Sequence, residues 1–346
     1  MKAISFNDPR FQLTGRIDIT NPESPMLIWP GSYVRFQFKG THLSLKLNNH
    51  RFWVGRFLGV VIDGDERCLP MCDGEQTLML AENLEDKPHE VYIYKRMEGH
   101  YVTLDRLLVN DNAELLTPSA KPKKRIEVYG DSVSAGSVVD CNEYLGTFDP
   151  ENHGGFYDNS WHAYPLILSR ILPAEVFVTS QGGIAIFDKT GYFEMPNMRG
   201  VESCYDKLAY CIDKPLTPWN WSFKPHVIVF AVGQNDHNPD PDCLRKPDYY
   251  KKWTDKYIEI ANSARSHSPN ATVIFAMTVL NHDEIWDNAM EDIKNRMGGE
   301  ENKVYHFVYS RCGKATPGHP RVAEQEEMAN ELKAFLESLP EDTWED

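Results

Sequence analysis

Ser132 is the residue whose type and surroundings most directly suggest covalent chemistry. It stands in the turn Gly130-Asp131-Ser132, after the β-prone run 126–129 and before a stretch of small residues. A buried strand that ends in such a turn delivers a serine to the start of a helix. Backbone N–H groups lack helical acceptors there, so a negative charge that develops beside the hydroxyl can be stabilised. Taken alone, the tripeptide is equally typical of an ordinary turn, and the serine still needs a base and oxyanion donors.

Later motifs can supply those groups. Asn235 lies in Gly233-Gln234-Asn235-Asp236, after another β-prone run, and its NH₂ group can donate to an oxyanion. His319 follows the last expected strand and precedes the last expected helix, which makes it the best placed general base of the twelve histidines. The pair Gly182-Gly183 would let backbone N–H groups approach a ligand closely. Each of these motifs can also be a simple turn.

These motifs require a sheet whose strand ends meet at one edge. From residue 126 onward strand-like and helix-like segments alternate, which indicates parallel strands and crossover helices in a doubly wound sheet. Such sheets bind ligands at the carboxyl ends of their strands. The expected strands are 126–129, 175–179, 226–232, 271–278 and 304–308, and the expected helices are 161–172, 248–267, 283–297 and 322–339.

The first part of the chain has a different pattern. Between about residues 26 and 110 apolar residues recur with period two, as in Val34, Phe36 and Phe38, and turn signals such as Asp63-Gly64 separate the runs. This alternation predicts half-buried strands of an antiparallel sandwich of the jelly-roll type. We therefore assign residues 1–118 to a β-sandwich, residues 119–125 to a basic linker and residues 126–346 to an α/β catalytic domain.

The composition restricts the class of partner. The 346 residues are 41% hydrophobic, and 51 acidic against 36 basic side chains give a net charge of −15. Such a charge would repel nucleic acid and anionic membranes, so a neutral small molecule or polysaccharide is expected. The first residues lack the apolar run of a signal peptide, and no stretch has membrane-spanning length. The seven cysteines show no paired metal-ligand spacing and are expected to be free thiols.

In this order and on these elements, the motifs resemble the SGNH or GDSL hydrolase superfamily. The preceding sandwich makes the chain similar to carbohydrate esterase family 2, whose members pair a jelly-roll domain with an SGNH domain and deacetylate plant polysaccharides. The resemblance implies that Ser132 is the nucleophile and His319 the general base. It also implies an oxyanion hole made of the N–H groups of Ser132 and Gly183 and the Asn235 side chain. The register Gly182-Gly183-Ile184-Ala185 leaves open which glycine contributes.

One position departs from the family pattern. Family members often carry an aspartate two or three residues before the histidine, where this chain has Pro317 and Thr316. We therefore expect a backbone carbonyl to accept the Nδ1 proton of His319, which gives a Ser132–His319 dyad. The alternative acids are Asp131, which should point away from the histidine, Asp236 and Asp283.

The implied function is a serine esterase that removes O-acetyl groups from acetylated xylan or glucomannan through an acetyl-enzyme, with no metal or organic cofactor. Alternatives are a lipid or thioester hydrolase of the same superfamily and a non-catalytic carbohydrate-binding protein. All catalytic groups are expected after residue 125, with the sandwich contributing only surface or stability. A monomer is expected, and the family implies an extracellular or periplasmic location. Candidate sugar-stacking residues are Tyr192, Trp219 and Trp286, while Trp161 and Trp221 look equally like core residues.

Overall fold

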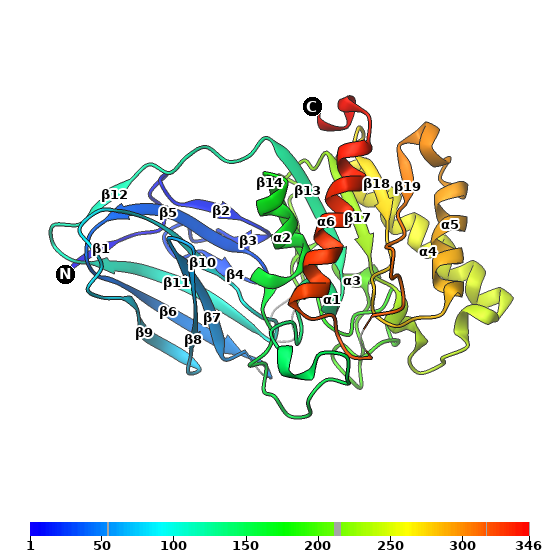
Figure 1. The fold of residues 1–346 in the computed structure, drawn as a ribbon, viewed down its shortest axis with the longest axis horizontal. Coiled ribbons are helices and arrows are strands. Elements are labelled where there is room, and N and C mark those ends of the chain that lie inside the picture. Colours follow the sequence, from blue (N-terminus) through cyan, green and yellow to red (C-terminus); the bar gives the residue numbers. More distant parts are fainter. Residues whose placement is uncertain (54, 211–215, 316, 346) are drawn as a thin grey trace.

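The N-terminal part of the protein is an antiparallel β-sandwich, drawn in blue and cyan at the left of Figure 1. The computed structural model describes residues 1–53, 55–210, 216–315 and 317–345. One sheet has the order β3-β4-β11-β6-β9, with β1 beside β11, and the other has the order β12-β5-β10-β7-β8, with β2 beside β5. The strands are β1 (Lys2–Ile4), β2 (Gln12–Thr14), β3 (Ile17–Asp18), β4 (Met26–Leu27), β5 (Tyr33–Lys39), β6 (Leu43–Arg51), β7 (Phe57–Ile62), β8 (Asp65–Pro70), β9 (Gly74–Ala81), β10 (Pro88–Tyr94), β11 (His100–Val109) and β12 (Glu114–Leu116).

The period-two pattern explains why these segments form a sandwich. Along β5, Val34, Phe36 and Phe38 are fully buried, whereas Arg35 between them reaches the surface side of the sheet and pairs with Glu90 of β10. Successive side chains of a strand point to opposite faces, so each strand lends one apolar face to the space between the sheets. The predicted sandwich is confirmed.

The C-terminal part is a doubly wound α/β fold, which confirms the predicted fold class. Its parallel sheet has the order β14-β13-β17-β18-β19. The strands are β13 (Lys124–Gly130), β14 (Ala174–Ser180), β17 (Val227–Ala231), β18 (Thr272–Phe275) and β19 (Val304–His306), and a small separate pair is β15 (Lys207–Ala209) with β16 (Thr217–Pro218). The helices are α1 (Ser132–Ala135), α2 (Tyr164–Ile171), α3 (Val201–Cys204), α4 (Pro247–Ser266), α5 (Glu284–Arg296) and α6 (Val322–Ser338).

Helices cover both faces of this sheet. Ile126 and Val128 of β13 belong to a core shared with α2 and α6, while Tyr129 of the same strand belongs to a core shared with α4 and α5. Figure 1 shows α6 in front of the sheet and α4 and α5 at its far right. Because both faces are buried, the strands are mostly apolar on both sides, as is usual for parallel sheets.

A buried arginine joins the two parts. Arg16, which follows β2, is fully buried and donates to Glu127 of β13 at 2.8 Å and to the Tyr129 hydroxyl at 2.7 Å. Removing one partner of a buried ion pair typically costs about 3–5 kcal/mol, because it leaves an uncompensated charge. The sandwich is thus fixed against the α/β part. Strand β12 ends at Leu116 before the predicted linker 119–125, and β13 begins at Lys124, so the last two residues of that linker lie in the strand. The domain boundaries stay a prediction.

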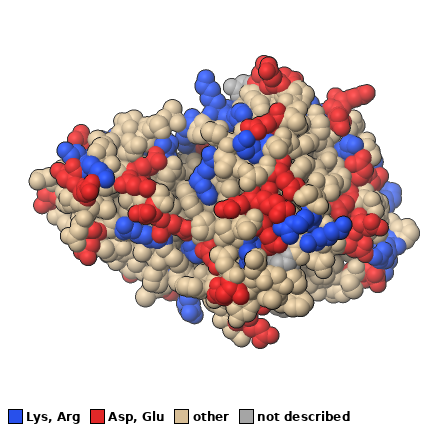
Figure 2. Space-filling view, viewed as in Figure 1, with Lys and Arg blue, Asp and Glu red and all other residues tan. Residues whose placement is uncertain are grey.

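Charged side chains of both signs are interspersed on the face shown in Figure 2. Residues of α6 take part in ion pairs, such as Glu327 with Arg311 and Glu337 with Lys333. Exclusion of nucleic acid stays a prediction from the net charge. Among the described residues, none of the helices combines the length and the apolar character needed to cross a membrane.

Candidate active site

The carboxyl ends of three neighbouring strands bring the predicted motifs together. Gly130 at the end of β13 is paired with Ser180 of β14 and with Ala231 of β17. The segments that follow these residues therefore start at the same edge of the sheet. They carry Ser132, the pair Gly182-Gly183 and Asn235.

Ser132 begins the helical turn α1, and Asp131 is its N-cap. The Oδ1 atom of Asp131 accepts the backbone N–H of Val133 at 3.0 Å, and burial raises the pKa of this carboxyl to about 6. The acid is therefore used as a helix cap. Because Ser132 is the first residue of the helix, its own N–H has no helical acceptor and can serve an oxyanion.

Five of the predicted site residues line one cavity of about 570 Å³. This volume is typical of a site for a small ligand or a few sugar units. The residues are Ser132, Gly183, Tyr192, Asn235 and His319.

A carboxylate from a distant part of the chain orients His319. The Nδ1 atom of His319 lies 2.6 Å from Oδ2 of Asp149, and the His319 backbone N–H donates to Oδ1 of Asp149 at 3.0 Å. Arg321 Nη1 donates to the same Oδ1 at 2.8 Å and to the His319 carbonyl at 2.6 Å. The prediction that a backbone carbonyl accepts the Nδ1 proton is therefore wrong. The carboxylate of Asp149, and not a backbone carbonyl, lies against His319 Nδ1.

This approach of the acid requires the glycine before the histidine. A Cβ atom added to Gly318 would lie 2.2 Å from Oδ1 of Asp149, far inside van der Waals contact. Without the side chain, the loop before α6 can lie directly against the loop that carries Asp149. Gly318 therefore allows Asp149 to approach His319.

Asp149 and His319 stabilise each other's charged forms. Burial raises the pKa of Asp149, but the hydrogen bonds from His319 and Arg321 outweigh burial and hold that pKa well below its usual value. Burial lowers the pKa of His319, but Asp149 outweighs that effect and the pKa of His319 is raised. Asp131 and Asp158 act on His319 in the same direction as Asp149. An imidazolium at this position is therefore stabilised, as a base that has just taken a proton requires.

Two contacts position the candidate oxyanion donors. Asn235 Nδ2 donates to the carbonyl of Ile184 at 3.0 Å, which identifies the nitrogen end of the amide and leaves its second N–H without an acceptor among the described residues. The N–H of Gly182 donates to Glu98 at 2.5 Å, whereas no described residue accepts the N–H of Gly183. Gly183 has a φ of +72°, which favours glycine. Of the two glycines left open by the sequence, Gly183 is the one with a free donor.

Two of the alternative acids have other structural roles. Asp236 accepts the backbone N–H groups of Ile186 and Phe187 at 2.7 and 3.3 Å, so it holds the loop after β14. Asp283 precedes α5 and forms an ion pair with Arg245. Neither is the carboxylate in contact with His319.

Glu98 of the sandwich also lines the cavity. It lies in the connection between β10 and β11, and its Oε2 accepts both the Gly182 N–H and Gln181 Nε2, the latter at 2.7 Å. Burial is the main cause that raises the pKa of this carboxyl to about 7. The prediction that the sandwich contributes only surface or stability is therefore wrong, because it holds the glycine segment of the site.

The three aromatic residues predicted to stack on sugar differ in their exposure to the cavity. Tyr192 is 46% exposed, lines the cavity and hydrogen-bonds through its hydroxyl to His237 at 2.9 Å. Trp219 is buried against Phe177, and Trp286 is buried against Trp253. Both tryptophans were predicted to bind sugar, and both predictions are wrong, because rings buried in the core cannot stack on a ligand. Apolar sequence context alone does not distinguish the two roles.

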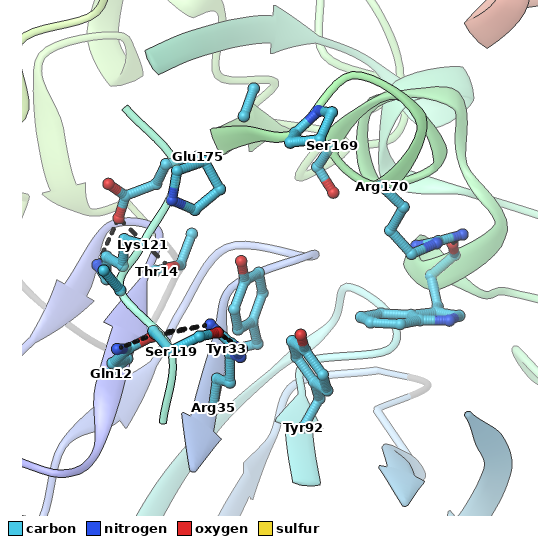
Figure 3. A pocket seen from close by; sticks show the side chains of 15 residues that line it. Gln12, Thr14, Tyr33, Arg35, Tyr92, Ser119, Lys121, Ser169, Arg170 and Glu175 are labelled. Atoms are coloured by element: carbon cyan, nitrogen blue, oxygen red, sulfur yellow. Dashed lines mark hydrogen bonds and ion pairs between the residues drawn. The ribbon is translucent and has the colours of Figure 1, made fainter. Parts of the chain in front are cut away.

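A second cavity of about 320 Å³ lies between the sandwich and the α/β part. In Figure 3, Tyr33 and Tyr92 lie on the sandwich side and Arg170 lies on the side of α2. Trp161 lines this second cavity and packs against Tyr92, while Trp221 stacks on His267 elsewhere. None of the candidate catalytic residues lines it.

Asp149 and Glu98 are the site residues that sequence reasoning missed. Asp149 lies in the long connection between α1 and α2, and connections of that length are often functional. That length was the available signal, but it does not single out one acid. Glu98 has no local signal, because its partner Gly182 is 84 positions away.

The chain is similar to known carbohydrate esterases. Residues 13–118 match the family model described as Carbohydrate esterase 2 N-terminal. This match covers most of the sandwich. Over 351 residues the chain is 22% identical to the cellulase/esterase CelE of Acetivibrio thermocellus. The alignment covers 96% of this chain but only 40% of CelE. It is 24% identical to an acetylxylan esterase/glucomannan deacetylase of Cellvibrio japonicus, over 97% of this chain and 91% of that protein.

A solved structure extends the likeness to the α/β part. A family two carbohydrate esterase from Clostridium thermocellum, in complex with cellohexaose, aligns with a TM-score of 0.78 and 22% identity, covering 94% of this chain and 98% of that one. At this identity the likeness shows the fold. The predicted resemblance to carbohydrate esterase family 2 is confirmed, and the relatives support the predicted enzyme class, a carboxylic ester hydrolase acting on carbohydrate.

Proposed function

We propose that this protein is a serine esterase that removes O-acetyl groups from plant polysaccharides, with acetylated xylan and glucomannan as its substrates. The observation that carries the proposal is the contact between His319 and Asp149 at the cavity lined by Ser132 and Asn235. A histidine held by a carboxylate beside a serine at a helix start is the arrangement of a general base and its nucleophile. We assign these roles to a Ser132–His319–Asp149 triad in place of the dyad expected from the sequence.

The first half of the reaction transfers the acetyl group to the protein. Asp149 accepts the Nδ1 proton of His319, so Nε2 carries the lone pair and takes the proton of the Ser132 hydroxyl. The serine oxygen forms a bond to the acetyl carbon. When the tetrahedral intermediate collapses, the bond to the sugar oxygen breaks and His319 returns the proton to that oxygen. Deacetylated sugar leaves and acetyl-Ser132 remains.

The second half releases acetate. Water gives a proton to His319 Nε2 and attacks the acetyl carbon, and the proton then passes to the departing serine oxygen. In both halves negative charge develops on the carbonyl oxygen. We assign its stabilisation to the N–H groups of Ser132 and Gly183 and to Asn235 Nδ2, each of which has a donor available.

The substrate class follows from the lining of the cavity and from the relatives. Glu98, Asp149 and Asp158 line it, so sugar hydroxyls would find hydrogen-bond acceptors there. Tyr192, partly exposed at the same cavity, offers an aromatic face to a sugar ring. The Cellvibrio japonicus relative is named for acetylxylan and glucomannan, and we extend those substrates to this protein.

The test is acetate release from acetylated xylan and acetylated glucomannan, compared with release of a longer acyl group from a matched ester. We expect rapid acetate release and weak activity on the longer ester, and Ser132→Ala should retain less than about a hundredth of the wild-type rate with an unchanged fold. Preference for the longer ester would indicate a lipid or thioester hydrolase. Sugar binding with no acetate release would indicate a non-catalytic binding protein, and substantial activity in Ser132→Ala would exclude Ser132 as nucleophile.

A further inference from the structure

His282, Asp287 and Cys312 form a compact cluster that the proposed reaction does not use. They come from three segments: His282 from the connection between β18 and α5, Asp287 from the first turn of α5, and Cys312 from the connection between β19 and α6. Because the ligand set is spread over three segments, no sequence spacing reveals it. Leu280, two residues before His282, lines the active-site cavity.

The three side chains present their coordinating atoms to one another. His282 Nε2 lies 3.1 Å from Oδ2 of Asp287 and 3.6 Å from Sγ of Cys312, and Sγ lies 3.3 Å from Oδ1 of Asp287. In a tetrahedral zinc site, bonds of about 2.0–2.3 Å place neighbouring ligand atoms about 3.3–3.6 Å apart. The Nε2 to Sγ separation of 3.6 Å matches two neighbouring corners of such a tetrahedron. The two Asp287 distances belong to different oxygens, and one ligand atom from each residue lies within 4.8 Å of the other two, so a small rotation of the carboxylate brings one oxygen to the third corner.

The hydrogen bond on the far side of the imidazole supports the same reading. His282 Nδ1 lies 2.6 Å from the carbonyl of Leu280, which can only accept, so Nδ1 carries a proton. In the neutral ring, Nε2 then presents a lone pair to the carboxylate of Asp287. A backbone carbonyl that fixes the tautomer in this way is typical of a metal-bound histidine. The side chain of His282 is 2% exposed, so water cannot easily separate the two groups.

We propose that His282, Asp287 and Cys312 bind one Zn²⁺ ion. A nitrogen, a carboxylate oxygen and a sulfur form a donor set that suits zinc and does not suit Mg²⁺ or Ca²⁺, which prefer oxygen alone. A water molecule can complete the coordination, because Asp287 is 21% exposed. The ion takes no part in the proposed ester hydrolysis.

The ion has a structural role in the loops of the active site. The backbone N–H of Gly313 donates to the carbonyl of Thr278 at 3.2 Å, and that of Ala315 donates to the carbonyl of Val279 at 2.9 Å. The segments after β18 and β19 therefore already run side by side. An ion bound by His282 and Cys312 adds a third link between them, near Leu280 and in the loop that continues to His319.

Without metal, the same residues have a competing arrangement. His282 would lie directly against Asp287, and the Cys312 thiol would donate to the carbonyls of Met277 and Thr278, which lie 3.6 and 3.5 Å from Sγ. That arrangement leaves a thiol in place of a thiolate. The state of the sulfur in the presence of metal thus distinguishes the two.

Cobalt binding to the whole protein tests the site. The protein is treated with a chelator, desalted and titrated with Co²⁺. We expect one equivalent to bind and to produce a thiolate-to-cobalt charge-transfer band that one equivalent of Zn²⁺ abolishes. Zn²⁺ should also raise the Tm progressively with its concentration. Absence of the band in the wild-type protein would overturn the proposal, and this readout does not depend on esterase activity.

Matched variants identify the ligands. Cys312→Ser should lose the band, whereas Cys68→Ser, which removes an exposed thiol of the sandwich, should keep it. Asp287→Asn should weaken Co²⁺ binding at least tenfold, whereas Asp283→Asn, at the start of the same helix, should not. If Cys312→Ser does not fold, the Asp287 and Asp283 variants still decide. A band that survives in Cys312→Ser, or equal affinities in the two aspartate variants, would overturn the proposal.

Discussion

Asp149→Asn should prevent His319 from accepting the serine proton while leaving a side chain of nearly the same shape at position 149. In the native protein, Oδ1 of Asp149 accepts from the His319 backbone N–H and from Arg321, while Oδ2 faces His319 Nδ1. An asparagine keeps its oxygen toward those two donors, because turning its NH₂ group there would place donors against donors. The NH₂ group then faces Nδ1 and donates to it. This leaves the histidine proton on Nε2, the atom that should accept the proton of Ser132.

The expected loss in kcat is roughly 10⁴-fold, as for the acid-to-amide change in a serine triad. That factor corresponds to about 5.4 kcal/mol of transition-state stabilisation, at about 1.36 kcal/mol for each factor of ten. KM should change little, because Asp149 acts through His319. Both constants are obtained from initial rates of acetate release from a soluble acetyl ester.

The control is Asp283→Asn, which removes a surface acid paired with Arg245 and should keep wild-type activity. Circular dichroism and thermal unfolding must show that Asp149→Asn is folded, since Arg321 is fully buried and loses a charged partner. A folded Asp149→Asn with kcat within about tenfold of wild type would refute the triad. An equal loss in Asp283→Asn would show that the effect is not specific to Asp149.

Three further predictions concern the same cavity. Asn235→Ala should lower kcat by roughly 10²–10³ through loss of one oxyanion donor, and an unchanged kcat would remove Asn235 from the hole. Only the neutral imidazole of His319 can accept a proton, and the pKa of this group is raised above 6.5. On acidification, kcat/KM should therefore fall with a midpoint above pH 6.5, and a midpoint below 6.5 would contradict this. Burial raises the pKa of Glu98 from an ordinary 4.5 to about 7, so the folded state binds this proton more tightly than the unfolded state does. The free energy of unfolding should therefore fall by up to about 3 kcal/mol as the pH rises from 4.5 to about 7. Urea unfolding at these two pH values should show a smaller decline in the free energy of unfolding for Glu98→Gln than for the wild type. Equal declines would contradict the raised pKa of Glu98.

Local patterns in the sequence were sufficient for the fold and for the order of the main site groups. Alternation such as Val34, Phe36 and Phe38 predicts a strand with one buried face, because side chains of a strand alternate. The alternation of strands and helices after residue 126 predicts a parallel sheet, and the carboxyl ends of its strands must share an edge. Ser132 and Asn235 follow such strand ends, so their presence at one cavity could be predicted.

Only the tertiary structure decided which distant residues complete the site. Asp149 and His319 are 170 positions apart, and Glu98 reaches Gly182 from the other half of the protein. Hydrophobic periodicity and turn chemistry describe each segment by itself and do not specify which loops meet. For the same reason the sequence suggested Trp219 as a sugar platform, although the fold buries it. The identity of a motif residue is thus local information, whereas the partner that holds it is set by the path of the whole chain.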